Sequence, residues 1–277
     1  MQSEQFEIIT HDGLTLIARS WLPGSKPKGA ICIVHGLGEH SGRYENITKP
    51  FLLKNYSILA FDLRGHGLSE GPRGHLGRLD MVLDDINLVI SKSPGFYDKI
   101  PFILYGHGLG GLLSLAYTLK KKHEIVKACI ASSPWLEMAF NMPEWKLRLG
   151  RLIAAFYPQF GVKTGYIIQN ISRDQNIVKD FLKDPLHHDI ISAGSFFQIK
   201  KAIELCENHA YNFNIPVLLN HGTSNKIVSH HSTEKLHERS GNRTQLKLWK
   251  GYKHELHHEP ENETYINFLQ DWIWEVT

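Results

Sequence analysis

The stretch Tyr105-Gly106-His107-Gly108-Leu109-Gly110-Gly111 decides the fold, because it joins an apolar run to a helical pattern through a glycine-rich turn. The run before it, residues 102–105, is short and unbroken, as expected for a strand buried on both faces. The segment after it, residues 111–119, has apolar residues at helical spacing and is followed by lysines, which the helix dipole favours there. Small residues at 106 and 110 allow a sharp strand-to-helix turn. We expect the central position, 108, to point into a site at the end of the strand.

Further short runs end in turn or polar residues in the same way, and they predict parallel strands. These runs are residues 30–34, 57–61, 128–131, 216–219 and 245–249. Residues 6–9 and 14–21 flank an Asp12-Gly13 turn and predict a hairpin. Helical patterns occupy residues 76–90, the segment from Ser232 onwards, and residues 265–275. The alternation predicts an α/β fold with a mostly parallel central sheet and helices on both faces.

The segment of about 135–210 interrupts this alternation, since it is long and helical in pattern. We interpret it as a cap insert over the carboxyl edge of the sheet, where ligands bind in such folds, within a single domain of residues 1–277. Its large apolar side chains either pack on the core and line a pocket, or face a lipid surface beside Lys146, Arg148 and Arg151. These side chains are Trp145, Leu147, Leu149, Leu152, Ile153, Phe156, Tyr157 and Phe160.

Composition excludes several classes of protein. Of the 277 residues, 42% are hydrophobic and 21% charged, which is typical of a globular chain. We expect neither a membrane-spanning helix, since no apolar run is long enough, nor a secretory signal in residues 1–5. A net charge of +3 is too small to indicate a nucleic-acid partner. We expect buried free thiols from the three cysteines, Cys32, Cys129 and Cys206, and a cytoplasmic setting. We also expect peripheral membrane contact through the cap.

Several short motifs, taken in order, resemble those of one family. They are HGLGEHSGRY at 35–44, DLRGHGLS at 62–69, the turn at 106–110, SRD at 172–174, DPL at 184–186, HGT at 221–223 and HEL at 254–256. Together they resemble the monoacylglycerol lipase and lysophospholipase branch of the α/β-hydrolases along nearly the whole chain. The resemblance implies the α/β-hydrolase fold, hydrolysis of a carboxylic ester, a monoacyl lipid or small ester as ligand, and neither cofactor nor metal.

Enzymes of this kind use a serine on the turn, an acid and a histidine, in that chain order. The resemblance implies that His254 is the base and that the acid position is Asn225, where family members have Asp. The nucleophile position is Gly108. The oxyanion hole maps onto the backbone N–H groups of Leu37 and Leu109, which need no particular side chain.

Two substituted members predict a disabled catalytic triad. Gly108 has no hydroxyl with which to form an acyl-enzyme, and loss of such a nucleophile costs about 10⁶ in turnover. Asn in place of the acid costs about 10⁴, because the imidazole is held in the wrong tautomer. Two explanations stay open: a natural pseudoenzyme that binds lipid or a protein partner without turnover, and an engineered inactive form of an active lipase. An ester or a peptide as the ligand also stays open.

Other interpretations of the same motifs are weaker. Ser114, Ser132 and Ser133 are alternative nucleophiles, but none lies at the turn, and Asp184 is an alternative acid. Residues 254–258 match H-E-x-x-H, yet a zinc site needs both histidines on one helix face, and here the motif follows a glycine turn. The G-x-G at 106–108 lacks the remaining spacing of a dinucleotide-binding loop.

Overall fold

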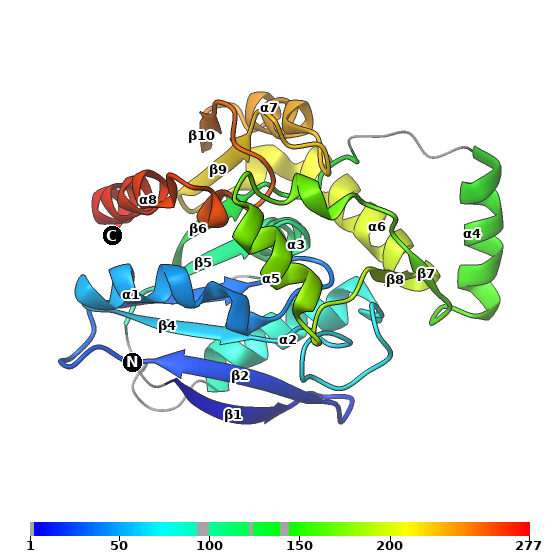
Figure 1. Ribbon diagram of the computed structural model, residues 1–277, viewed down its shortest axis with the longest axis horizontal. Coiled ribbons are helices and arrows are strands. Elements are labelled where there is room, and N and C mark those ends of the chain that lie inside the picture. The colour runs from blue at the N-terminus through cyan, green and yellow to red at the C-terminus, as the bar shows by residue number, and fades with distance from the viewer. Residues whose placement is uncertain (1–2, 93–99, 122–123, 139–143) are drawn as a thin grey trace.

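The structure is a computed structural model that describes residues 3–92, 100–121, 124–138 and 144–277; the side chain of Lys146 lies outside this description. Its main sheet has eight strands in the order β1-β2-β4-β3-β5-β6-β9-β10 (Figure 1). Their bounds are β1 Glu4–Ile9, β2 Thr15–Trp21, β3 Gly29–Val34, β4 Tyr56–Phe61, β5 Phe102–His107, β6 Val126–Ser132, β9 Val217–Gly222 and β10 Thr244–Trp249.

The sheet is parallel along the order from β4 to β10, and β2 is the strand that runs against the others. β2 pairs antiparallel with both β1 and β4, whereas the pairs from β3–β4 to β9–β10 are parallel. Every residue of β3, β4, β5 and β9 is buried, which explains their unbroken apolar runs. The predicted α/β fold and its mostly parallel sheet are confirmed.

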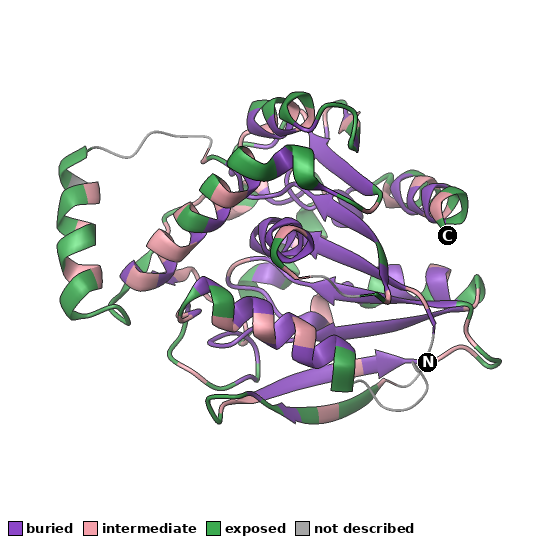
Figure 2. Cartoon of the chain, turned by 180° about the vertical axis from the view of Figure 1, so that it is seen from behind, coloured by how far each residue is buried: buried purple, intermediate pink, exposed green. Residues whose placement is uncertain are grey.

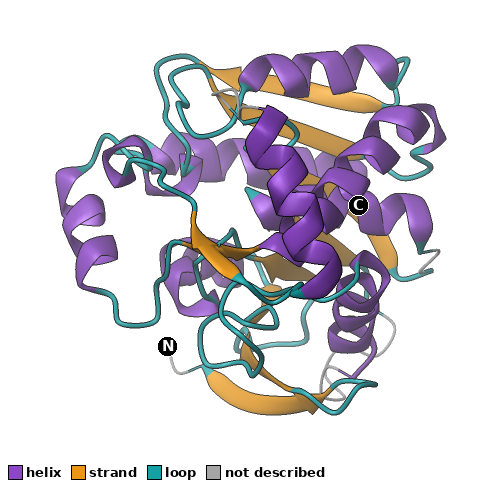
Figure 3. Ribbon diagram, turned by 90° about the vertical axis from the view of Figure 1, so that its right-hand side faces the viewer, coloured by secondary structure: helices purple, strands orange, loops and turns teal. Residues whose placement is uncertain are grey.

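Helices cover both faces of the sheet (Figures 1 and 3). α1 (Glu45–Leu53) and α8 (Asn262–Val276) pack on one face, where they share a core cluster with the sheet. The other face carries α2 (Leu79–Lys92), α3 (Leu109–Lys120), α6 (Ala193–His209) and α7 (His230–Arg239). The sequence patterns did not indicate α1, which carries Pro50 within it. Two-sided cover leaves the open carboxyl edge of the sheet as the natural position for a site.

The segment expected as a cap has a mixed structure. It contains α4 (Glu144–Phe156), α5 (Gln175–Lys183), and a two-stranded antiparallel sheet of β7 (Gly161–Lys163) and β8 (Ile190–Ser192), which the sequence did not indicate. Its last element, α6, packs along α3 in the helix layer of the sheet. α4 stands apart from the sheet and is exposed along most of its length (Figure 2). Within the described ranges, no helix combines the length and apolarity that crossing a bilayer requires.

Candidate functional site

The turn between β5 and α3 holds Gly108 in a backbone conformation with φ 55° and ψ −115°. Its amide donates to the carbonyl of Ser132 at 2.9 Å, which ties the turn to the end of β6. Two residues on, Gly110 lies so close to β3 that an added Cβ would overlap the carbonyl oxygen of Val34. The small residues of this turn therefore allow α3 to start directly against the sheet.

His254 lies over Gly108 and faces it with its ring. It belongs to the loop after β10, is 9% exposed, and its carbonyl accepts a hydrogen bond from the Ser133 hydroxyl at 2.8 Å. A Cβ built on Gly108 would lie 3.3 Å from Nε2 of His254. The histidine thus points at the place that a side chain at 108 would occupy.

Asn225 connects to the other nitrogen of this histidine. Its Oδ1 accepts from the backbone amides of Ile227, at 3.0 Å, and Val228, at 3.2 Å. Its Nδ2 donates to Nδ1 of His254 at 3.0 Å and to Nε2 of His221 at 3.1 Å. A flipped amide would place its NH₂ group against two backbone N–H donors. The orientation of the Asn225 side chain is therefore determined by the backbone of its own loop.

This orientation determines the tautomer of His254. Because Nδ1 accepts a hydrogen bond from Asn225, the proton of the neutral ring sits on Nε2, the atom that faces Gly108. Burial, followed by the nearby His107, holds the pKa of His254 well below its usual range, so the ring is neutral. A carboxylate at 225 would instead accept a hydrogen bond from Nδ1–H and leave a lone pair on Nε2.

Leu37 and Leu109, the two expected oxyanion-hole residues, border the same space. Leu109 is the first residue of α3, where amides have no partner within the helix, and Leu37 lies in the loop after β3. That loop is held by His35, whose Nε2 accepts from the amide of Leu63 at 2.9 Å and whose Nδ1 donates to the carbonyl of Gly36 at 2.7 Å. The two expected oxyanion-hole residues and His254 line one pocket with Gly108, and Asn225 lies behind His254.

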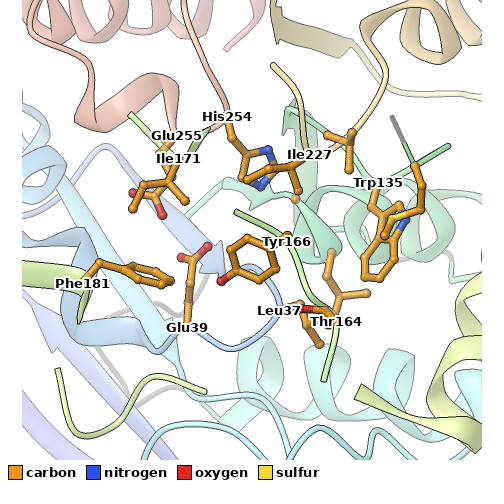
Figure 4. A pocket seen from close by; sticks show the side chains of 14 residues that line it. Leu37, Glu39, Trp135, Thr164, Tyr166, Ile171, Phe181, Ile227, His254 and Glu255 are labelled. Atoms are coloured by element: carbon orange, nitrogen blue, oxygen red, sulfur yellow. The ribbon is translucent and has the colours of Figure 1, made fainter. Parts of the chain in front are cut away.

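The pocket has a volume of about 510 Å³, including the part that opens to solvent (Figure 4). Its apolar walls come from the loops after β3 and β6, from the cap and from the segment after β9. The apolar lining residues are Leu37, Leu109, Trp135, Met138, Ile171, Phe181, Ile227 and Val228. Thr164, Tyr166, Glu39 and Glu255 add polar groups. The arrangement fits a ligand with an apolar body and one polar end.

A buried charge cluster borders the pocket on one side. Oε2 of Glu255 accepts from Arg43 at 2.7 Å and from Nδ1 of His258 at 2.6 Å. Although burial opposes it, the charge of Arg43 and the bond from His258 hold the pKa of Glu255 well below its usual range. Glu39 accepts from the Tyr44 hydroxyl at 2.9 Å, and burial, together with the charge of Glu255, raises its pKa to about 8. Glu39 is therefore largely protonated at neutral pH.

The alternative catalytic groups do not reach the pocket. Among the described residues that line it there is no serine, so Ser114, Ser132 and Ser133 lie elsewhere. Asp184 pairs with Nε2 of His40 at 2.7 Å and does not take the acid position. Within the H-E-x-x-H motif only Leu256–His258 forms a short 3-10 turn, and His254 is engaged by Asn225. The helical arrangement that a zinc protease requires is absent from this described segment.

Sequence reasoning missed several residues of the pocket, namely Glu39, Tyr166, Phe181 and Glu255. Glu39 lies in the motif at 35–44 and Glu255 directly follows His254, so their positions within these motifs could have indicated both. Tyr166 and Phe181 belong to the cap and carry no sequence signal, because only the packing of the cap over the sheet brings them to the pocket.

Comparison with known proteins shows the family of the chain. The model of the serine aminopeptidase S33 family matches residues 25–261, which is most of the chain. The chain belongs to this family. Its scaffold is that of a monoglyceride lipase-like α/β-hydrolase.

Two relatives and one solved structure illustrate the similarity. The chain is 35% identical to an uncharacterised abhydrolase domain-containing protein of Dictyostelium discoideum, over 99% of this chain but only 29% of that protein's length. It is 26% identical to a monoacylglycerol lipase of Mycolicibacterium smegmatis, covering 94% of this chain and 93% of the relative. The crystal structure of a Paleococcus ferrophilus monoacylglycerol lipase superposes with a TM-score of 0.84 at 27% identity, covering both chains in full.

Proposed function

We propose that this hydrolase-family scaffold holds a monoacyl lipid or small ester in the pocket above Gly108 without hydrolysing it. One observation carries the proposal: Asn225 donates to Nδ1 of His254, so the atom facing position 108 is an N–H group. A triad needs a hydroxyl at 108 and a lone pair on Nε2, and this site offers neither. A water molecule at 108 would find no general base for the same reason.

The class of ligand is supported by the relatives and by the pocket. Several similar proteins are named monoacylglycerol or monoglyceride lipases, and the pocket here joins apolar walls to a polar end. A peptide is a poorer fit, because binding of its terminal ammonium group needs a free carboxylate. Glu255 is already paired with Arg43, and the pKa of Glu39 is raised by burial and the Glu255 charge to about 8.

We also propose that the chain is one domain whose cap, within residues 135–210, contacts a lipid surface in a cytoplasmic setting. The support is the exposure of large apolar side chains on α4 and just after it, among them Trp145 (63%) and Phe156 (80%). Arg148 and Arg151 lie on the same helix, where they suit anionic headgroups. Monomeric proteins rarely expose so much contiguous apolar surface without a function.

A serine-directed fluorophosphonate tests the absence of a nucleophile. We expect no labelling of the native chain at any serine, because the reagent reports an activated hydroxyl. An active serine hydrolase serves as the positive control for the reagent. Stoichiometric modification of one serine, located by mass spectrometry, would contradict the proposal and identify the residue that replaces position 108.

Rebuilding the triad tests the two positions together. Gly108→Ser alone should give little hydrolysis of p-nitrophenyl butyrate or of a monoacylglycerol, since Nε2 of His254 still carries a proton. The double variant Gly108→Ser/Asn225→Asp should hydrolyse these esters about 10²–10⁴ times faster than the single serine variant, because the acid partner restores the catalytic tautomer of His254. Asn225→Asp alone should remain inactive. Equal activity of the single serine variant and the double variant would show that Asn225 is not the acid position.

A further inference from the structure

We propose that the ligand bound at Gly108 is a free monocarboxylate, the anion of an acyl chain, and that His254 donates a hydrogen bond to it. This inference rests on the proposed function, because it requires that the site does not act as a triad. It replaces the ester of that proposal by its carboxylate. The inference starts from Asn225, whose amide is oriented by the backbone and determines which nitrogen of His254 faces the pocket.

Three N–H donors belong to residues that line the pocket at Gly108. Nε2 of His254 carries the ring proton, belongs to a residue that is more than nine-tenths buried, and has no hydrogen-bond partner among the described residues. The amide of Leu109 opens α3, whose positive dipole end favours an anion. Leu37 lines the same pocket from the loop after β3, and its backbone N–H is the third donor. Two carboxylate oxygens can accept all three N–H groups.

The substitutions at 108 and 225 act in the same direction. With Asp at 225, Nε2 of His254 would be an acceptor, and its lone pair would repel an anionic oxygen. With Ser at 108, the side chain would fill the space beside Nε2, because even its Cβ would lie 3.3 Å from that atom. Glycine and asparagine together convert a site for a nucleophile into an open space that is lined by donors.

The charges that face the pocket permit an anion. The titratable lining groups are Glu39, Tyr166, His254 and Glu255, with Arg43 in the layer behind them. Glu255 is neutralised by Arg43 at 2.7 Å. Burial and the Glu255 charge raise the pKa of Glu39 to about 8, so this carboxyl is mostly uncharged at neutral pH. Tyr166, with its pKa raised by burial, also stays neutral.

Apolar walls account for the rest of the ligand. Trp135, Met138 and Phe181 line the same pocket and offer an acyl chain an apolar surface. A short polar anion such as acetate would use the donors but not these walls. We therefore expect affinity to rise with chain length from acetate to dodecanoate.

Isothermal titration calorimetry of the full chain at pH 7 with three matched ligands tests the proposal. Each ligand is kept below the concentration at which it forms micelles. Dodecanoate carries the charge, dodecanamide has the same shape without it, and 1-monododecanoylglycerol is the ester. We expect dodecanoate to bind at least about 10-fold more tightly than either neutral ligand, since hydrogen bonds to an ionised acceptor are about twice as strong.

Two variants assign the effect to His254. Asn225→Asp should lower the affinity for dodecanoate about 10-fold or more, because it removes the proton from Nε2 of His254. The affinity for dodecanamide should stay nearly unchanged. Since this variant also adds a charge, His254→Phe provides the uncharged test, and it should likewise remove most of the preference for dodecanoate over dodecanamide. Nitrogen-15 NMR of the native protein should show the His254 proton on Nε2.

The affinities of the native chain for the three ligands test the carboxylate proposal even if both variants misfold. Equal affinities for dodecanoate and dodecanamide, tighter binding of the ester, or binding of none of the three would overturn the carboxylate proposal. Release of dodecanoate from the monoacylglycerol during the titration would instead contradict the proposed function, because it shows turnover. A proton on Nδ1 of His254 would remove the physical basis of the inference.

Discussion

Gly108 has a backbone conformation, φ 55° and ψ −115°, that residues with a side chain adopt only under strain. We predict that Gly108→Ser lowers the free energy of unfolding by about 1–3 kcal/mol, measured by urea denaturation. Gly24→Ser is the matched control, because Gly24 is exposed and an added Cβ would meet no atom there. A serine variant as stable as the native chain would show that the turn tolerates a side chain without strain.

Glu39 is the second residue with an unusual environment. Its pKa is raised by burial, and by the Glu255 charge, to about 8, so between pH 4.5 and 8 the unfolded chain ionises this group while the folded chain keeps it protonated. The free energy of unfolding of the native chain therefore falls as the pH rises through this range, because of Glu39. The isosteric Glu39→Gln variant has no such loss, so at pH 9 it should gain about 5 kcal/mol relative to the native chain, compared with its relative stability at low pH.

The measurement is the difference in unfolding free energy between the native chain and the Glu39→Gln variant at several pH values. Well below pH 4.5 both proteins carry a neutral side chain at this position in the folded and unfolded states, so the pH-dependent part of the difference should vanish. Glu7→Gln on exposed β1 serves as the control and should show no comparable pH-dependent gain. A constant difference across the whole range would mean that Glu39 does not titrate as its burial requires.

At the scale of elements, α4 packs against α6 and still carries large apolar side chains that are exposed. Leu152 and Phe156 are exposed although both are large and apolar. We predict that the double substitution Leu152→Ser/Phe156→Ser lowers partitioning onto anionic phospholipid vesicles about 10-fold or more, measured by sedimentation. The melting temperature should stay nearly constant, since these side chains contribute little to the core.

A control for this prediction lies away from the cap. Leu53 at the end of α1 is also exposed, at 71%, and Leu53→Ser should leave vesicle binding unchanged. Equal partitioning of the native chain and the α4 variant would contradict a lipid contact through the cap. The apolar surface of α4 would then face some other partner.

At the scale of the whole molecule, three buried cysteines report on whether the chain unfolds as one unit. Cys32 lies on β3, Cys129 on β6 and Cys206 on α6, the element that the expected insert contributes to the helix layer. All three are fully buried within one core cluster, and burial raises the pKa of the Cys32 thiol to about 12. A thiol reagent therefore reaches them only when the structure opens.

We predict that the alkylation rates of the three thiols in the native chain correspond to one common free energy of opening. This free energy should equal the free energy of global unfolding. Mass spectrometry of a timed labelling reaction provides the rate for each cysteine. Much faster labelling of Cys206 than of Cys32 and Cys129 would show that the segment containing α6 opens by itself. Residues 1–277 would then not behave as one cooperative domain.

Local patterns in the sequence determined most of the elements. The runs that became β3, β5 and β9 were recognisable because strands buried on both faces are rich in apolar residues without alternation. The turn at Gly108 was recognisable because only small residues allow such a turn. α1 was missed because Pro50 lies inside its pattern, and β7–β8 because three-residue strands are too short to show a period.

The sequence alone also determined which residues stand at positions 108, 225 and 254, and hence our proposal that this site lacks a catalytic hydroxyl and an acid. Only the tertiary structure decided which way the amide of Asn225 points, because its neighbours Ile227 and Val228 have to present their backbone amides together. It also decided the exposure of α4 and the pairing of Glu255 with Arg43. Such features depend on contacts between distant segments, and these contacts exist only once burial has brought the segments together.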